Sequence, residues 1–304
     1  MRRKVFAISV LALLLVGCTR RPDPFLVDDT KGHHSHPVWS PDGNSLAFIL
    51  DSDLWLMSSL SGHHKQRITG EFFTTKSRDA QLATWLPDGR IAYVEWASDL
   101  DIGLPDRSVR LYDPKNRRTT VVKQGLNRID ALARSPLGNE EVWLIMDSSP
   151  DVRSPGSNSA YRLDIKTGTL TSLPFLPTDR GLSDLKWIPG SDRVAYVLKQ
   201  RLYVVDLKTG DTIDLPDGTD DVGAIAVSPN GRWIAFRRYA TSRNGRRGGT
   251  FVVDANLHNP PHQLSSVEMV SLDWSPDGTK LVYTTVGAPG QNELRLFEVP
   301  AEFQ

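Results

Sequence analysis

The sequence has little cysteine, no excess of charge of either sign and no hydrophobic run long enough to cross a membrane. A single cysteine among 304 residues excludes an internal disulfide bond and a metal site built from several cysteines. The 36 Lys and Arg residues balance 36 Asp and Glu residues, so the chain lacks the basic surface of a general nucleic-acid binder. The longest apolar run, Val5 to Val16, is shorter than the stretch of about 20 residues that a transmembrane helix needs. The remaining composition, 39% hydrophobic and 24% charged, is that of an ordinary globular protein.

The apolar run has the features of a secretory signal. It follows the basic residues Arg2, Arg3 and Lys4, and its length suits the hydrophobic core of a signal peptide. The run ends in a motif that resembles the lipobox of bacterial lipoproteins, Leu15-Val16-Gly17-Cys18. The resemblance implies that residues 1–17 form a signal peptide that is cleaved before Cys18, and that residues 18–35 form a lipidated tether.

A lipoprotein signal predicts where the protein works. Diacylglyceryl and palmitate chains on Cys18 would anchor it to the cell membrane or the outer membrane, facing the periplasm or the cell exterior. Two alternatives stay open, because an ordinary signal peptide with a chance cysteine, or an uncleaved signal anchor, fits the same run.

One short motif recurs six times through the rest of the chain. Its prolines are spaced 46, 49, 53, 40 and 47 residues apart. Three copies are close to W-S-P-D-G and three are degenerate: Trp39–Gly43, Trp85–Gly89, Arg134–Gly138, Trp187–Gly190, Val227–Gly231 and Trp274–Gly278. A short β-rich run follows each copy, and a second such run follows after a connection. Periods of this length indicate a repeat architecture.

The motif favours a tight turn between two strands. Proline presets φ for the second position of a type I turn, Asp or Asn suits the next position, and Gly accepts a positive φ at the end. Sheets of four antiparallel strands cannot bury both faces alone, so they pack face to face around an axis. Residues 36–304 are therefore predicted to form an all-β, six-bladed β-propeller, with the tryptophans of the motif buried between blades.

The repeats resemble the PD40 (WD40-like) repeats of TolB-type propellers, over about residues 36 to 299. The resemblance implies the fold. It does not imply the role of TolB in the Tol–Pal complex, because TolB carries a separate α/β domain before its propeller and is a soluble periplasmic protein. The last repeat stops near Val299, so its fourth strand is expected to come from Pro24–Asp28, closing the ring.

Strand order predicts which connections share a face. The W-S-P-D-G turns lie on one side, here called the turn face, and the connections between second and third strands lie on the other, called the loop face. The long connections 97–107, 148–158 and 238–249 are therefore expected on the loop face. The third is rich in arginine and is the candidate site for a ligand or partner, through Arg237, Arg238, Tyr239, Arg243, Arg246 and Arg247. Guanidinium groups suit carboxylates, phosphates and sulfates, and a solvated loop is the alternative.

No catalytic motif or metal-binding pattern stands out. The sequence has no G-x-S-x-G, H-E-x-x-H, P-loop or G-x-G-x-x-G motif. His33, His34 and His36 could hold a metal only weakly, whereas His63 and His64 are expected on the opposite face. We therefore expect a monomeric, non-catalytic propeller without a cofactor, which binds an envelope protein and no nucleic acid. The alternatives are a binder of an anionic envelope ligand or glycan, and a polysaccharide lyase or hydrolase that acts near the central pore.

Overall fold

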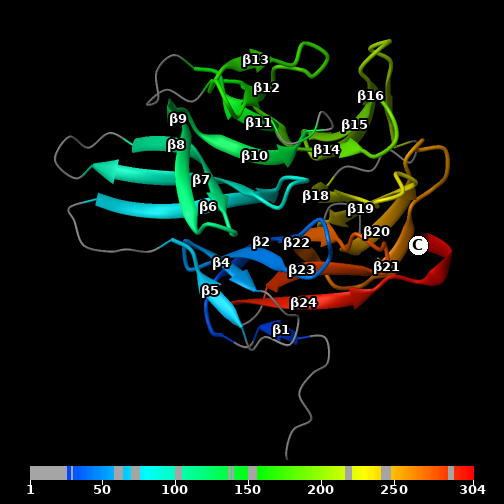
Figure 1. Ribbon diagram of the computed structural model, residues 1–304. Helices are drawn as coiled ribbons and strands as arrows, with labels where there is room; N and C mark the ends of the chain where they lie inside the picture. The colour runs from blue at the N-terminus through cyan, green and yellow to red at the C-terminus, as the bar shows by residue number, and fades with distance from the viewer. Residues whose placement is uncertain are drawn as a thin grey trace, which may run out of the picture.

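The computed structural model describes residues 26–28, 30–57, 64–69, 76–99, 105–135, 138, 140–149, 156–215, 221–240, 248–286 and 291–304. Six sheets of four antiparallel strands surround a central axis (Figure 1). The six-bladed propeller expected from the repeats is confirmed. Among the described residues, no helix is long and apolar enough to span a membrane.

The first three blades follow the chain order from the innermost to the outermost strand. Blade one is β2 (His34–Trp39), β3 (Leu46–Leu50), β4 (Asp53–Met57) and β5 (Lys65–Arg67). Blade two is β6 (Lys76–Trp85), β7 (Ile91–Asp99), β8 (Pro105–Asp113) and β9 (Arg118–Leu126). Blade three is β10 (Ile129–Arg134), β11 (Glu141–Asp147), β12 (Asn158–Asp164) and β13 (Leu170–Ser172).

The last three blades repeat this order, except that the sixth takes its outer strand from the N-terminus. Blade four is β14 (Leu182–Ile188), β15 (Arg193–Leu198), β16 (Arg201–Asp206) and β17 (Thr212–Asp214). Blade five is β18 (Val222–Val227), β19 (Trp233–Arg238), β20 (Gly249–Asp254) and β21 (His262–Ser265). Blade six is β22 (Met269–Trp274), β23 (Lys280–Val286), β24 (Asn292–Glu298) and β1 (Leu26–Asp28), and the 3₁₀-helix Ala301–Phe303 ends the chain.

The serine of the repeated motif holds the turn between the first two strands. The hydroxyl of Ser40 accepts the N–H of Ser45 at 2.9 Å and donates to the carboxylate of Asp42 at 2.6 Å. Gly43 ends the turn with a φ of 72°, in the left-handed region that favours glycine. Ser275 makes the same pair of contacts in the sixth copy. The motif therefore recurs because each of its residues supplies a contact or a backbone angle that the turn needs.

The motif tryptophans pack between neighbouring blades. Trp39, Trp85 and Trp274 are 6%, 6% and 4% exposed, and each joins a hydrophobic cluster with residues of the preceding blade. The indole N–H of Trp85 also donates to the carbonyl oxygen of Val38 in blade one, at 3.1 Å. Trp187 is only partly buried and packs edge-on against Trp143, with ring centroids 6.2 Å apart. The blades are therefore joined mainly by apolar burial.

The N-terminal strand completes the last blade. β1 pairs antiparallel with β24, and Val27 packs in one cluster with Trp39 and Leu294 at the junction of blades six and one. Of the expected strand Pro24–Asp28, the structure describes Leu26–Asp28, and Pro24 and Phe25 lie outside the described residues. Leu26–Asp28 thus takes the place in the last blade that the sequence analysis expected of the ring-closing strand.

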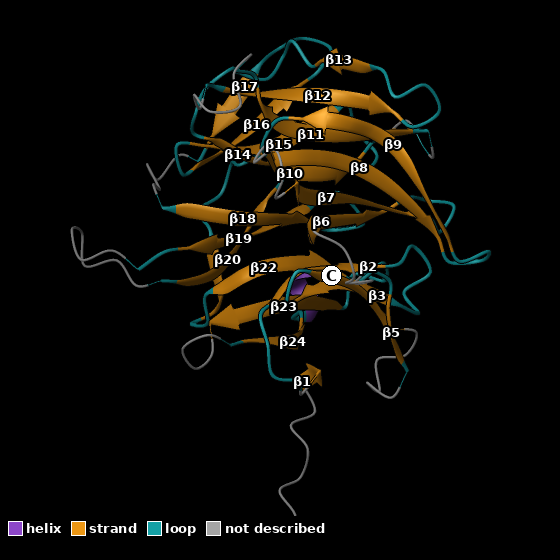
Figure 2. Cartoon of the chain, turned by 90° about the vertical axis from the view of Figure 1, so that its left-hand side faces the viewer, coloured by secondary structure: helices purple, strands orange, loops and turns teal. Residues whose placement is uncertain are grey.

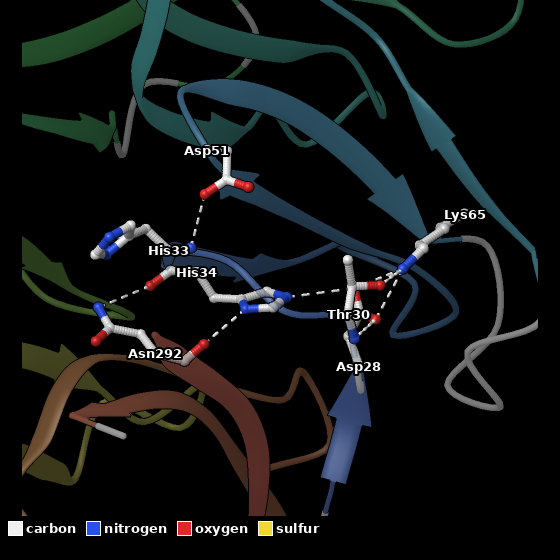
Figure 3. A network of polar contacts seen from close by, with 7 residues as sticks. All are labelled: Asp28, Thr30, His33, His34, Asp51, Lys65 and Asn292. Carbon is white, nitrogen blue, oxygen red and sulfur yellow. Dashed lines mark hydrogen bonds and ion pairs between the residues drawn. The ribbon is translucent and has the colours of Figure 1, made fainter. Parts of the chain in front are cut away.

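Polar side chains hold the same junction (Figure 3). The carboxylate of Asp28 accepts hydrogen bonds from the ammonium of Lys65 at 2.8 Å and from the backbone N–H of Thr30 at 2.9 Å. The ring of His34 lies between two acceptors, Asp28 Oδ2 at 3.3 Å from Nε2 and the carbonyl oxygen of Asn292 at 2.7 Å from Nδ1. Burial alone would raise the pKa of Asp28, but the hydrogen bonds from His34, Lys65 and Thr30 outweigh it and hold that pKa well below its ordinary value.

Blade two is larger than expected. The predicted loop 97–107 is partly strand, because the ladder between β7 and β8 continues through Ala97↔Asp106 and Ser98↔Pro105. The polar composition of this stretch hid its strand character, since residues on a projecting hairpin need no apolar face. The other two predicted connections, 148–158 and 238–249, agree to within one residue with the gaps between β11 and β12 and between β19 and β20.

Candidate functional site

A channel of about 990 Å³ runs along the propeller axis. Its wall is formed by the innermost strand of each blade, namely β2, β6, β10, β14, β18 and β22 (Figure 1). Pro41, Pro189, Pro229 and Pro276 of the repeated turns line it at the turn face. Tyr239, Lys199 and Arg180 line it at the loop face. Residues of all six blades therefore line the channel.

The blades contribute unequal chemistry to the channel. Blade five supplies small residues such as Gly223 and Ala224, whereas four other blades supply ionisable side chains. These are His36 from β2, Asp130 and Arg134 from β10, Asp184 and Lys186 from β14, and Asp273 from β22. The charged side chains therefore come from two pairs of neighbouring blades, three and four on one side of the channel and six and one on the other, and such placed polar groups can orient a ligand.

Asp273 is the most perturbed carboxyl of the channel. Burial raises its pKa to about 6, although the backbone N–H of Trp39 and the charges of Arg134 and Lys186 act in the opposite direction. The Trp39 N–H donates to Asp273 Oδ2 at 2.9 Å, which ties blade one to blade six. A carboxyl that is costly to ionise, held among cations in a channel, is a candidate for function.

His36 lies beside the same junction. Its backbone N–H donates to the hydroxyl of Ser271 at 3.1 Å. Its side chain is accessible to solvent, but it lines the channel and is surrounded by the other blades. Burial, together with the charge of Lys186, lowers the pKa of His36 to about 4, while the charge of Asp184 acts in the opposite direction. The ring is therefore neutral at pH 7 and can donate or accept a hydrogen bond.

Asp184 and Lys186 form a pair on β14. The Lys186 ammonium lies 3.0 Å from Asp184 Oδ1, while Asp184 Oδ2 accepts the backbone N–H of Ile225 at 3.1 Å. The pair thus has a structural task, because it joins blade four to blade five, and its lysine still adds positive charge to the channel wall.

Arg134 occupies the position that tryptophan holds in four other copies of the motif. Its side chain is exposed to the channel, and it has no hydrogen bond or ion pair with any residue that the structure describes. The sequence analysis treated this copy only as degenerate. The replacement of a buried aromatic residue by a cation in a repeat was the signal that could have identified it. Asp273 and Lys186 could have been identified in a similar way. Each directly precedes the tryptophan of its motif, at the position that uncharged Val38 and Thr84 occupy in blades one and two.

The described part of the arginine-rich connection packs against the propeller. Arg237 forms an ion pair with Glu268 at 3.1 Å, and its guanidinium lies 4.1 Å from the ring centroid of Tyr239. A Cβ atom on Gly223 would lie 3.1 Å from the Tyr239 ring, so this tyrosine rests on blade five at the channel mouth. Arg238 lies over the ring of Phe251, with 4.2 Å to its centroid. Arg243, Arg246 and Arg247 lie outside the described residues.

The remaining candidates are placed as follows. Leu15, Val16, Gly17 and Cys18 lie outside the described residues. His34 belongs to the junction of blades six and one, and His36 faces the channel, so the two histidines have different environments. Within the described ranges, no group of three or more His, Cys, Asp or Glu side chains is placed to hold a metal ion.

No protein-family model and no curated protein matches the chain, but solved structures do. TolB from Acinetobacter baumannii has a TM-score of 0.60 at 17% identity, over 87% of this chain and 63% of that one. This chain therefore spans less than two thirds of the Acinetobacter protein. An Agrobacterium tumefaciens protein assigned as TolB has a TM-score of 0.60 at 16% identity, over 88% and 91% of the two chains. An oligogalacturonate lyase in complex with manganese has a TM-score of 0.56 at 14% identity, over 88% and 77%. At these identities the likeness concerns the fold alone, and the chain has a TolB-like β-propeller fold.

Proposed function

We propose that the protein is a membrane-anchored, extracytoplasmic propeller that binds another protein of the cell envelope. The observation that carries the proposal is the position of β1. Leu26 follows Cys18 by eight positions, so a lipid on Cys18 would hold the start of β1 within about 28 Å of the membrane surface. β1 lies on the outer rim of the ring, at the opposite side from β13 (Figure 1).

Anchoring at the rim leaves the binding surfaces accessible. With the rim of blade six toward the membrane, the turn face and the loop face both lie roughly perpendicular to the membrane plane. The membrane then covers neither end of the channel. Blades three and four point away from the lipid. This arrangement suits a protein that presents its faces to a partner in the envelope, and it agrees with the use of propellers as rigid platforms for binding.

Two experiments test the proposal. Palmitate labelling of the wild type and of Cys18→Ser tests the anchor, and label retained by the variant would contradict it. Crosslinking in native membranes, followed by capture and mass spectrometry, tests the partner. We expect one reproducible envelope protein, lost when residues 148–158 or 238–249 are replaced by Gly-Ser linkers of equal length. Capture of no protein from intact membranes would contradict the interaction module.

A second candidate function is the binding of an anionic ligand in the channel. The guanidinium of Arg134 forms no hydrogen bond or ion pair with a described residue, and Tyr239 and Lys199 line the loop-face mouth, where Lys199 also pairs with Asp179. Two solved structures with this fold are oligogalacturonate lyases, which by name act on an acidic oligosaccharide. Their activity supports a lyase or hydrolase as a further alternative.

Calorimetry with oligogalacturonate, and mass spectrometry of the incubated sugar, separate binding from cleavage. Arg134→Ala should remove binding in the channel, whereas replacement of Arg243, Arg246 and Arg247 by Ala should remove binding that depends on the connection. Binding of the sugar without a cleavage product would support a ligand-binding protein, and a cleavage product would support an enzyme. If the sugar is neither bound nor cleaved, the protein-interaction module remains the supported function.

A further inference from the structure

The outer strand of blade two differs from every other outer strand that the structure describes. β9 has nine residues, whereas β1, β5, β13 and β17 have three and β21 has four. β8 and β9 curve away from the body of the ring and are joined by a turn that projects from it (Figure 2). The ring does not need this extension, because the neighbouring blades are closed by much shorter strands.

The first part of β9 is an open sheet edge. The strand order of blade two ends with β9, so half of its backbone N–H and C=O groups point away from β8. The N–H of Arg118 donates to Asn116 Oδ1 in the adjoining turn at 3.0 Å, and no backbone hydrogen bond from another described segment reaches Arg118–Val121. All four residues are exposed, and Val121 is 48% exposed. An exposed edge of this kind is a template for pairing with another chain.

Two irregularities define the length of the edge. The register between β8 and β9 shifts at Val122, between Val121 and Lys123, and again before Leu126. The regular edge therefore runs from Arg118 to Val121 and includes the β-branched residues Thr119, Thr120 and Val121, which favour extended backbone. Four residues suffice for pairing in this fold, since β13 and β17 pair with their neighbours over three.

Unpaired cations flank the edge. Lys115, Arg117 and Arg118 lie at the turn between β8 and β9, and Lys123 follows the regular part of β9. None of the four forms an ion pair with any residue in the described ranges. The nearby carboxylate of Asp113 is engaged by the backbone N–H of Lys115 at 2.9 Å and by the amide of Asn116 at 2.8 Å. The surroundings of the edge thus attract negative charge.

We propose that the β9 edge, residues 118–121, receives an extended acidic segment of a partner protein as a fifth strand of blade two. The main-chain hydrogen bonds of strand addition would supply affinity, and the cations at both ends would select acidic flanks. The inference rests on the proposed function, because it names where the envelope protein docks and what kind of segment it uses.

A synthetic peptide tests the proposal directly. The probe alternates Thr and Val and carries two Glu residues at each end, and its control carries Lys in their place. We expect the acidic peptide to bind the full-length protein in detergent, measured by fluorescence anisotropy, and the Lys peptide not to bind. Hydrogen exchange should show protection of amides within residues 118–121 when the acidic peptide is added. Binding without protection there, or equal binding of both peptides, would overturn the proposal.

Proline at adjacent positions supplies a matched pair of variants. Thr119→Pro and Thr120→Pro each remove one N–H, but one of these faces the open edge and the other pairs with β8. Thermal unfolding identifies the outward position as the variant with the unchanged melting temperature. That variant should weaken peptide binding about fivefold to tenfold. An unchanged affinity in the stable variant would overturn strand addition.

A charge variant and the membrane experiment separate this proposal from the function on which it rests. Arg117→Ser combined with Arg118→Ser should weaken binding of the acidic peptide about threefold to fivefold at low salt, and less at high salt. Crosslinking in membranes should lose its partner when the stable proline variant replaces the wild type. If a partner is captured equally by that variant, the docking edge is wrong while the interaction module stands.

Discussion

Asp28, in the outermost strand of the last blade, and Lys65, in the outermost strand of the first blade, form an ion pair of 2.8 Å with the carboxylate almost fully buried. The pair spans the seam where the two ends of the propeller sequence meet. The buried imidazole of His34 lies on the other side of the same carboxylate. The seam therefore depends on a charged group in β1, the first strand that the structure describes (Figure 3).

Loss of the Asp28 charge should open this seam. Asp28→Asn removes the ion pair with Lys65 and leaves the lysine ammonium half-buried without its partner, which we expect to cost about 3 kcal/mol of unfolding free energy. For a domain of this size, the melting temperature should fall by about 6–10 °C. Differential scanning calorimetry at pH 7 measures the change, and Glu298→Gln on the exposed end of β24 is the control. A shift of Asp28→Asn no larger than that of the control would contradict the role of the pair.

The same carboxylate should make stability depend on acid pH. Because the folded-state pKa of Asp28 lies below its ordinary value of 3.8, the ionised group stabilises the fold above about pH 4. That stabilisation is lost as the pH falls further toward the folded-state pKa. Urea unfolding between pH 7 and pH 2.5 should show a loss of stability below pH 4 that is smaller in Asp28→Asn. Parallel curves for the two proteins would show that other groups govern acid unfolding.

Deletion of residues 19–29 should destabilise the propeller more than the single substitution. The deletion removes β1, exposes the edge of β24 and withdraws Val27 from the cluster with Trp39 and Leu294. Loss of the buried valine alone costs about 2 kcal/mol. We expect a melting temperature several degrees below that of Asp28→Asn. Equal midpoints for the deletion variant and the wild type would refute ring closure by β1.

Asp273→Asn should stabilise the protein at neutral and alkaline pH. Because the folded-state pKa, about 6, lies above the ordinary value of 3.8, the protonated carboxyl stabilises the fold below about pH 4. This contribution is lost as the pH rises through about 6. Asparagine stays neutral and keeps an oxygen for the Trp39 N–H, so the variant should gain about 2 kcal/mol at pH 8 and little at pH 4. A constant difference across this range would contradict a costly charge at Asp273.

The His36 ring should remain neutral well below pH 6. NMR titration of the imidazole should give a pKa near 4, since burial and the Lys186 charge both disfavour the imidazolium. Lys186→Met removes that charge and leaves Asp184, so the pKa of His36 should rise, while burial keeps it below the ordinary value. A wild-type value near the ordinary 6.5 would place the ring in bulk solvent instead of in the channel.

Much of the architecture could be predicted because the repeated turn is formed by contacts between residues that are close in the sequence. Ser40, Pro41, Asp42 and Gly43 form a turn through contacts within a few residues, and six such turns imply six blades. The extent of blade two was underestimated, because the strand ends at Ala97–Asp99 and Pro105–Arg107 lack the apolar alternation used to recognise strands. The candidate connection was found by its arginines, but its described residues Arg237 and Tyr239 contact Glu268 and Gly223, far along the chain.

The sequence by itself determined the six turns, the number of blades and the strand that could close the ring, and it predicts an address signal in residues outside the described part of the chain. Each of these follows from residues that are neighbours along the chain, where turn geometry and hydrophobic patterning act. Only the tertiary structure decided that Asp28, His34 and Lys65 meet at one seam, and that Arg134, Lys186 and Asp273 face one channel. Their electrostatic environments arise from burial and from charges on other blades. A pattern of residues close in the sequence contains no information on either.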